Sequence, residues 1–300
     1  MGCHTLLQVD AFTDRPLEGN PCAVVFDADS LTDKTMLRVA REMNLSETAF
    51  VLRSTRADFG ARYFTPSEEI PPAGHPTVAT VFGLVETGRL RLAGDDTAVT
   101  LELCDGPIRV DIRAQQGVVR EVVMTQRRPR FLATYDAPEV LPVFGLTPDD
   151  LLPGTPVQTV STGTPQLMIA LRDLDRLRRV RPDIAAYERL RSRADFFSPH
   201  LFCLEGATPA GRTFARHFGA PPDVLEDPFT GSATGGMAVY LWRYGLIDEP
   251  RFRAEQGHWM GRPGIAAVEV LGSREDPESV RVGGSAVTVV RGELVVPGGS

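Results

Sequence analysis

Two short segments of the sequence combine glycine with side chains that can hold or move a proton. One is Ala73-Gly74-His75-Pro76-Thr77, and the other runs from Glu226-Asp227 to Gly231-Ser232. Each stands before an apolar stretch typical of a buried helix. Glycine at a helix start lets a ligand approach the backbone, and the free N–H groups of the first turn attract a carboxylate or an oxyanion. These residue types predict a binding site for a small anionic molecule.

Glu47 is the acidic residue best placed to serve such a site. The helical pattern before it ends at Asn44 and the β-rich run Thr48 to Leu52 follows, so Glu47 lies at a helix-to-strand junction. Side chains at such junctions often point into clefts. Its apolar flanks predict a partly desolvated carboxylate with a raised pKa, which suits proton abstraction next to a carbonyl or a conjugated system.

The residues alone leave plainer interpretations open. Glu47 can be an ordinary exposed acid in a turn, and His75 can be a buried residue that is hydrogen-bonded within its capping turn. Asp227 can cap the helix expected to begin near Gly231. A capping role and a role in chemistry do not exclude each other.

Several chemistries lose support because the residues they need are missing. Lys34 is the only lysine and no glycine-rich loop precedes it, which opposes a P-loop and a Schiff-base enzyme. The glycines form no dinucleotide-binding pattern, and no His-Glu-x-x-His occurs. The sequence therefore predicts an enzyme that uses no cofactor and no metal.

Charge and cysteine spacing restrict the partners and the compartment. A formal net charge of -7 opposes nucleic-acid binding. No stretch is long and apolar enough for a membrane span, and the first residues do not form a signal peptide, so we expect a cytoplasmic protein. Four widely spaced cysteines (Cys3, Cys22, Cys104 and Cys203) predict neither a disulfide framework nor zinc, and we expect them to be buried free thiols.

Hairpin patterns and a few helices make up the rest of the chain. Alternating runs around the expected turns Asp105-Gly106, Gln116-Gly117 and Arg291-Gly292 predict antiparallel strands. A helix capped by Thr32 or Asp33 is expected to end at Asn44, and a buried helix is expected from His75-Pro76 to Val85.

The second half of the sequence repeats motifs of the first half in the same order. Gly74 matches Gly231 and Gly19-Asn20-Pro21 resembles Gly163-Thr164-Pro165. We therefore predict an α+β fold of two pseudo-symmetric domains, each a curled, barrel-like antiparallel sheet around a central helix. The predicted domains are residues 1–120 and 121–300, with the last strands able to return to the first domain.

The order of motifs along nearly the whole chain resembles that of the phenazine-biosynthesis PhzF family. The motifs that carry the resemblance are Val9-Asp10-Ala11-Phe12-Thr13, Gly19-Asn20-Pro21, Ser46-Glu47-Thr48-Ala49-Phe50, Phe64-Thr65-Pro66 to Gly74-His75-Pro76-Thr77, Glu226-Asp227-Pro228 to Gly231-Ser232-Ala233, and Glu255-Gln256-Gly257 to Gly261-Arg262-Pro263. The resemblance implies the diaminopimelate-epimerase-like fold, an active site between the two domains, and homodimers.

The resemblance also implies roles for particular residues. The family's catalytic glutamate falls on Glu47, its histidine on His75 and its aspartate on Asp227, while its glycine and serine positions fall on Gly74, Gly231 and Ser232. The family's characterised reaction isomerises a dihydro-hydroxyanthranilate, and its glutamate moves a proton between ring carbons.

Two residues depart from the family pattern. Pro72 stands where an aromatic residue is usual, and Phe229 replaces the usual alanine after Asp-Pro. Both flank the expected pocket, so they bear on which substrate is accepted and not on the proton chemistry.

Three functions compete at this point. We favour a cofactor-independent isomerase in which Glu47, His75 and Asp227 act on a small carboxylate-bearing substrate. A racemase or epimerase of the same fold would use two opposed cysteine bases, which the paired motifs lack. A small-molecule binding protein without turnover is the third possibility, and the complete set of acids and histidine argues against it.

Overall fold

The computed structural model describes residues 2–70, 73–221 and 223–296. These residues divide into two compact units, and each is described by itself below. Unit 1 comprises the described residues up to Thr125 together with those from Gly283 onward, and unit 2 comprises Gln126–Val282. The sequence places the domain boundary between residues 120 and 121, and this boundary stays a prediction.

Unit 1 contains most of the strands of the first half of the chain and the last strand of the second half. Its strands are β1 (Gly2–Ala11), β2 (Asn20–Val25), β3 (Glu47–Leu52), β4 (Phe59–Phe64), β5 (Glu69–Ile70), β6 (Asp96–Leu103), β7 (Gly106–Gln115), β8 (Val118–Gln126, whose last residue belongs to unit 2) and β18 (Ala286–Val296). Its helices are α1 (Asp33–Met43), α2 (Gly74–Glu86) and the short 3-10 helix Ala28–Ser30.

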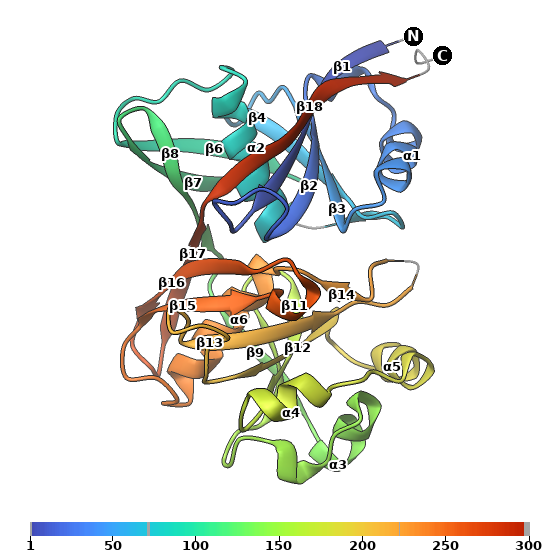
Figure 1. Cartoon of the computed structure of the whole chain (residues 1–300), viewed down its shortest axis with the longest axis vertical. Coiled ribbons are helices and arrows are strands. Elements are labelled where there is room, and N and C mark those ends of the chain that lie inside the picture. Colours follow the sequence, from blue (N-terminus) through green and yellow to red (C-terminus); the bar gives the residue numbers. More distant parts are fainter. Residues whose placement is uncertain (1, 71–72, 222, 297–300) are drawn as a thin grey trace. The chain divides into compact units, whose positions relative to one another are not determined.

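The strands of unit 1 form one curled sheet. β1 pairs antiparallel with both β18 and β2, and β3 pairs antiparallel with β4. β6, β7 and β8 continue as antiparallel hairpins. Two pairings are parallel, β2 with β3 and β4 with β6. In Figure 1, β18 in red runs along β1 in blue, so the two ends of the chain meet in one sheet.

Helix α1 begins and ends as the sequence predicts. The Thr32 hydroxyl accepts a hydrogen bond from the Thr35 N–H at 3.3 Å, which caps the first turn. Asn44 adopts a left-handed conformation with φ 51° and closes the helix. The chain then turns directly into β3, and Glu47 is the first residue of that strand.

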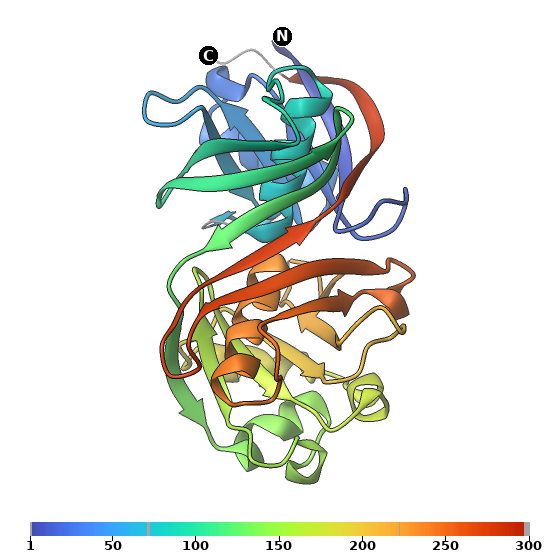
Figure 2. The same cartoon turned by 90° about the vertical axis from the view of Figure 1, so that its left-hand side faces the viewer.

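Helix α2 is the central element of unit 1. Ten of its thirteen residues are buried, including the whole first turn from Gly74 to Thr77. A helix that is apolar nearly all round requires such an environment, and the predicted buried helix is therefore confirmed. Figure 2 shows α2 behind the green strands β7 and β8.

The predicted hairpin turns have different outcomes. Leu103 pairs with Gly106, so the first hairpin exists but its turn is Cys104-Asp105, one residue earlier than predicted. Gln115 pairs with Val118, so the second turn is confirmed. Gln116 and Gly117 both have positive φ (53° and 78°), as a tight hairpin turn requires.

The turn predicted at Arg291-Gly292 is wrong. β18 runs without interruption from Ala286 to Val296, and its partner β1 pairs Leu7 with Arg291 and Leu6 with Gly292. A long partner strand keeps the glycine in extended conformation, which a local turn pattern cannot reveal.

Unit 2 contains the corresponding elements of the second half. Its strands are β9 (Arg130–Tyr135), β10 (Val157–Ser161), β11 (Pro165–Ala170), β12 (Ser198–Cys203), β13 (Thr213–Phe218), β14 (Glu226–Asp227), β15 (Arg251–Gln256), β16 (Gly264–Gly272) and most of β17 (Pro277–Gly284). Its helices are α3 (Ala137–Val140), α4 (Leu174–Arg179), α5 (Ile184–Arg191) and α6 (Gly231–Arg243), with 3-10 helices at Leu141–Phe144, Pro148–Asp150 and His258–Met260.

Unit 2 repeats the strand pairing of unit 1. β9, β10 and β11 pair antiparallel in that order, as β18, β1 and β2 do. β11 pairs parallel with β12, and β13 pairs parallel with β15, as β2 does with β3 and β4 with β6. Helix α6 is buried along most of its length and contacts β10, β11 and β16 (Figure 1). The predicted fold of two pseudo-symmetric halves, each with a central helix, is confirmed.

The cysteines agree only in part with the expectation from the sequence. All four cysteines are unpaired; Cys22 and Cys203 are buried, whereas Cys3 and Cys104 are exposed, so burial is predicted correctly for two of them.

No helix in the described part of the chain combines the length and apolar character needed to cross a bilayer.

The packing of α2 predicts the effect of adding one methyl group. A Cβ at Gly83 would lie 2.9 Å from Cζ of the buried Phe26 ring. Gly83→Ala gains about 1 kcal/mol of helix propensity, but overpacking costs about 1–3 kcal/mol. We expect urea denaturation to show a lower free energy of unfolding. In a Phe26→Leu background the same change should be neutral or stabilising, and an equal loss in both backgrounds would contradict this explanation.

Candidate active site

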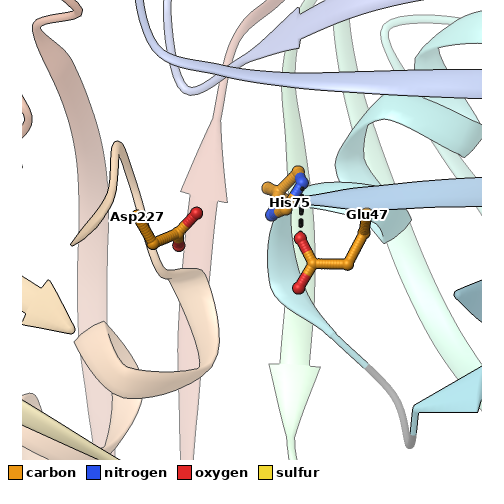
Figure 3. Close-up of side chains that lie close together, drawn as sticks. All are labelled: Glu47, His75 and Asp227. Atoms are coloured by element: carbon orange, nitrogen blue, oxygen red, sulfur yellow. Dashed lines mark ion pairs between the residues drawn. The ribbon is translucent and has the colours of Figure 1, made fainter. Parts of the chain in front are cut away.

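His75 and Glu47 form a contact in the interior of unit 1. The His75 side chain is 3% exposed and the Glu47 side chain 17% exposed, and His75 Nε2 lies 3.0 Å from Glu47 Oε2. Figure 3 marks this contact with a dashed line. The two atoms touch without the alignment that a full hydrogen bond requires.

The secondary structure positions both side chains. Glu47 begins β3 immediately after the turn that follows α1, and His75 is the second residue of α2. Ala73, the N-cap of α2, provides no side-chain hydrogen bond to the first turn. The N–H groups of that turn, including that of Gly74, have no partner within the helix itself.

Asn20 and Ser46, two buried polar residues to which the sequence assigns no role, fix the other ring nitrogen of His75. The Ser46 hydroxyl donates to Asn20 Oδ1 at 3.1 Å, so the Asn20 amide turns its Nδ2 toward His75. Asn20 Nδ2 lies 3.1 Å from His75 Nδ1. Because an amide nitrogen can only donate, Nδ1 is the acceptor and carries no proton. A neutral His75 therefore has its proton on Nε2, facing Glu47.

Burial keeps His75 neutral. Its pKa is lowered to about 3 because the buried ring cannot keep the hydration that a cation needs. The contact with Glu47 is thus between a neutral N–H donor and a carboxyl group, not between two full charges. His75 therefore adds no positive charge beside the Glu47 carboxyl group.

Cys22 is the neighbour of Glu47 on the adjacent strand. The two residues are paired in the parallel register of β2 and β3. The pKa of the buried Cys22 thiol is raised well above its usual value, first by burial and then by the nearby Glu47 carboxylate. The thiol is therefore protonated at neutral pH and contributes no charge beside Glu47.

Asp227 lies in unit 2, in strand β14. Its Oδ2 accepts a hydrogen bond from the Thr230 hydroxyl, and its backbone carbonyl accepts one from Gln256 Nε2 at 2.7 Å. Gln256 also accepts from the Thr230 N–H at 3.2 Å through Oε1. Gln256 thus links the loop between β14 and α6 to strand β15. The sequence identifies the motif that contains Gln256 but does not predict these hydrogen bonds.

Asp227 is not the N-cap of α6, although its position in the sequence allows that role. Thr230 is the N-cap, and its side chain makes no capping hydrogen bond to the first turn of the helix. Gly231 is buried as the first helical residue, and Ser232 follows it half-buried. The Gly231 carbonyl accepts from Gln126 Nε2 at 2.9 Å. The N-terminal N–H groups of this thirteen-residue helix therefore receive no cap from the Thr230 side chain and point toward a potential anion.

The two departures from the family pattern have different positions. Pro72 lies outside the described residues. Phe229 is completely buried and packs on the backbone of Gly264, where any Cβ would lie 2.6 Å from its ring. Phe229 therefore packs in the interior of unit 2, next to the loop that follows Asp227.

Neither unit taken alone offers a metal site in its described residues. In neither do three histidine, cysteine or carboxylate side chains come together as a ligand set. The expectation that the protein uses no metal and no cofactor stays a prediction.

Comparison with known proteins gives a consistent result. A family model described as phenazine biosynthesis-like protein, PhzC-PhzF, matches residues 9–292. The trans-2,3-dihydro-3-hydroxyanthranilate isomerase of Pseudomonas fluorescens is 34% identical over 98% of this chain and 100% of its own length. An uncharacterised isomerase of Clostridium acetobutylicum is 32% identical, with 98% of each chain covered.

Solved structures share the fold. The crystal structure of a PhzF-family phenazine biosynthesis protein of Bacillus anthracis has a TM-score of 0.87 and 31% identity, with 99% of this chain and 100% of that chain covered. A hydroxyproline epimerase of Agrobacterium vitis has a TM-score of 0.67 at 13% identity, with 97% and 92% covered, and is similar in fold alone.

The buried histidines predict how stability depends on pH. Burial lowers the pKa of His75 and of His217 to about 3, so the unfolded chain takes up protons below about pH 6.5 that the native protein does not. The free energy of unfolding should fall as the pH falls, by up to about 1.4 kcal/mol per pH unit for each histidine. Denaturation between pH 6.5 and 5, where most carboxylates are still charged, measures the slope. His75→Gln should reduce it by one proton equivalent, and an unchanged slope would refute the assignment.

The Asn20 contact predicts the tautomer of His75. In wild type, NMR of protein labelled with ¹⁵N-histidine should find the proton on Nε2. Asn20→Asp replaces the donor by an acceptor of nearly the same shape, so the ring should place a proton on Nδ1. Ser46→Ala removes the group that orients the amide and should shift the population in the same direction, but less. A wild-type ring protonated on Nδ1 would contradict this hydrogen-bond network.

Proposed function

This chain belongs to the PhzC-PhzF family of phenazine biosynthesis-like proteins, and we propose that Glu47 carries a proton between two carbons of its substrate. The chain is an isomerase, as are the relatives that match it from end to end. What we propose is the mechanism: general acid/base catalysis by Glu47, assisted by His75 and Asp227, without a cofactor.

The contact between His75 Nε2 and Glu47 Oε2 is the observation that carries this proposal. Glu47 as a carboxylate takes a proton from one carbon, and the electron pair of the broken C–H bond moves into the conjugated system of the substrate. The protonated Glu47 then returns the proton to a second carbon. The neutral N–H of His75 can hydrogen-bond the carboxylate before the transfer or a substrate oxygen during it. Nothing is oxidised or reduced, and substrate and product are isomers.

Residues of unit 2 are proposed to bind and orient the substrate. Asp227 is held by Thr230 and Gln256, so its carboxylate has a fixed position from which it can accept hydrogen bonds. Gly231 and Ser232 begin α6, whose free N–H groups favour an anion. Gly74 offers the same feature at the start of α2.

These groups fit a small molecule that bears a carboxylate. Trans-2,3-dihydro-3-hydroxyanthranilate, for which the P. fluorescens relative is named, is such a molecule and is the first substrate to test. The buried Phe229 and the position of Pro72 are the departures that could favour a related acid instead. We expect the enzyme to act as a homodimer, as the resemblance implies, and in the cytoplasm, as the sequence predicts.

The observed cysteines oppose a racemase or epimerase with two cysteine bases. Burial raises the pKa of Cys22 well above its usual value and that of Cys203 to about 11. The pKa values of Cys3 and Cys104 are raised as well. A thiol needs a lowered pKa to act as a base at neutral pH, so Glu47 is the better proton carrier.

Replacing the proposed base tests the function directly. Glu47→Gln keeps the shape of the side chain but cannot accept a proton, so turnover of trans-2,3-dihydro-3-hydroxyanthranilate should fall by about 10²- to 10⁴-fold. The dissociation constant should change little. In deuterated water the wild-type product should gain deuterium wherever the Glu47 proton exchanges before its return.

Glu42→Gln is the matched control, because Glu42 is an exposed acid of α1. It should retain wild-type turnover. Near-wild-type turnover of Glu47→Gln on any substrate that the enzyme isomerises would remove Glu47 from the mechanism and make Asp227 the next base to examine.

A further inference from the structure

A pair of histidines in unit 2 has no role in the reaction described so far. His200 lies on β12 and His217 on β13, and the two are direct partners across these antiparallel strands. Their Nδ1 atoms lie 3.3 Å apart and their ring centroids 5.5 Å apart. Both are buried, although His217 keeps 5% of its surface exposed and His200 none. Only His217 can therefore touch a ligand.

His217 is also the cross-strand partner of Asp227. Strands β13 and β14 are antiparallel, and His217 faces Asp227 in their register. Directly opposed residues project from the same face of a sheet with neighbouring Cβ atoms. The next residues along the strands, Arg216 and Glu226, form an ion pair on the other face. The imidazole therefore stands beside the carboxylate to which the proposed function gives a substrate-binding role.

The two rings must share one hydrogen atom. Burial lowers the pKa of His217 to about 3 and that of His200 well below its usual value, so both are neutral at pH 7. A hydrogen bond between two neutral imidazoles through their Nδ1 atoms needs a proton on one nitrogen and a lone pair on the other. The two arrangements differ in which Nε2 carries a proton.

The environment of His200 decides between them. Its Nε2 is buried and has no hydrogen-bond partner among the described residues. A proton there would be an orphaned buried N–H, which folded proteins avoid more strictly than an under-used acceptor. The favoured arrangement places the His200 proton on Nδ1, from which it is donated to His217 Nδ1. His217 then has its proton on Nε2.

We propose that His217 is a specificity-determining residue, fixed by His200 as an Nε2–H donor that binds a carboxylate or carbonyl oxygen of the substrate beside Asp227. This inference rests on the proposed function for the location of the substrate. A neutral N–H donor favours an oxygen acceptor and disfavours an ammonium group at the same position. His200 acts through His217 and is a positioning residue.

The first experiment determines the tautomers by NMR of protein labelled with ¹⁵N-histidine. We expect the proton of His217 on Nε2 and that of His200 on Nδ1. His200→Asn retains an N–H where Nδ1 lies and should keep the His217 tautomer, whereas His200→Leu should release it. A His217 ring protonated on Nδ1, or a tautomer that is unchanged in His200→Leu, would overturn the proposal.

The second experiment tests recognition with anthranilate as the probe and aniline, which lacks the carboxylate, as the matched control. Anthranilate should shift the Nε2 and Hε2 signals of His217, and aniline should not. The dissociation constant of anthranilate should rise by about 10- to 100-fold in His217→Leu. His217→Gln places an amide N–H close to the Nε2 position and should recover most of the affinity. An unshifted His217 signal, whether or not anthranilate binds, would overturn the recognition role.

These outcomes are independent of the proposed proton transfer. Neither experiment measures turnover, so His217 can prove to be the donor even where Glu47→Gln retains activity. Conversely, loss of turnover in Glu47→Gln together with an unshifted His217 signal would keep the function and remove this inference.

Discussion

A neutral imidazole can donate one hydrogen bond and accept one, and when it is buried each choice fixes the other. The candidate site depends on this constraint. Asn20 occupies the acceptor nitrogen of His75 and thereby directs its proton toward Glu47. Asn20 can do so because Ser46 holds its amide oxygen. The glutamate for which we propose an acid/base role thus lies against a donor that carries no charge of its own.

The same strand order places different chemistry in the two units. In unit 1, the strand that follows the parallel crossover begins with Glu47, and the buried central helix carries His75. In unit 2, the equivalent helix begins after Asp227, and the neighbouring strand carries His217. Equivalent ion pairs, Arg62 with Glu69 and Arg216 with Glu226, join equivalent strands in both units. The two units thus share their strand pairing and a central helix, whereas the polar residues inside them differ.

The sequence predicts what local chemistry determines. The apolar character of Gly74–Glu86 identifies a buried helix, the glycines mark both helix starts, and Thr32 and Asn44 delimit α1. It does not predict contacts between distant segments. Asn20 contacts His75 because helix α2 packs on β2, and His200 contacts His217 because their strands are paired in register. The uninterrupted β18 depends on its partner β1. Buried polar residues next to motif glycines, such as Asn20, were the available clue.

The pairing of the first and last strands has a consequence for how the protein is made. Unit 2 is one continuous segment, Gln126–Val282, and all of it leaves the ribosome before β18 is complete. Unit 1 needs β18 against β1, so during synthesis β1 stays an unprotected sheet edge until β18 emerges. The sheet that carries Glu47 is therefore completed after unit 2 has been synthesised and can already be folded.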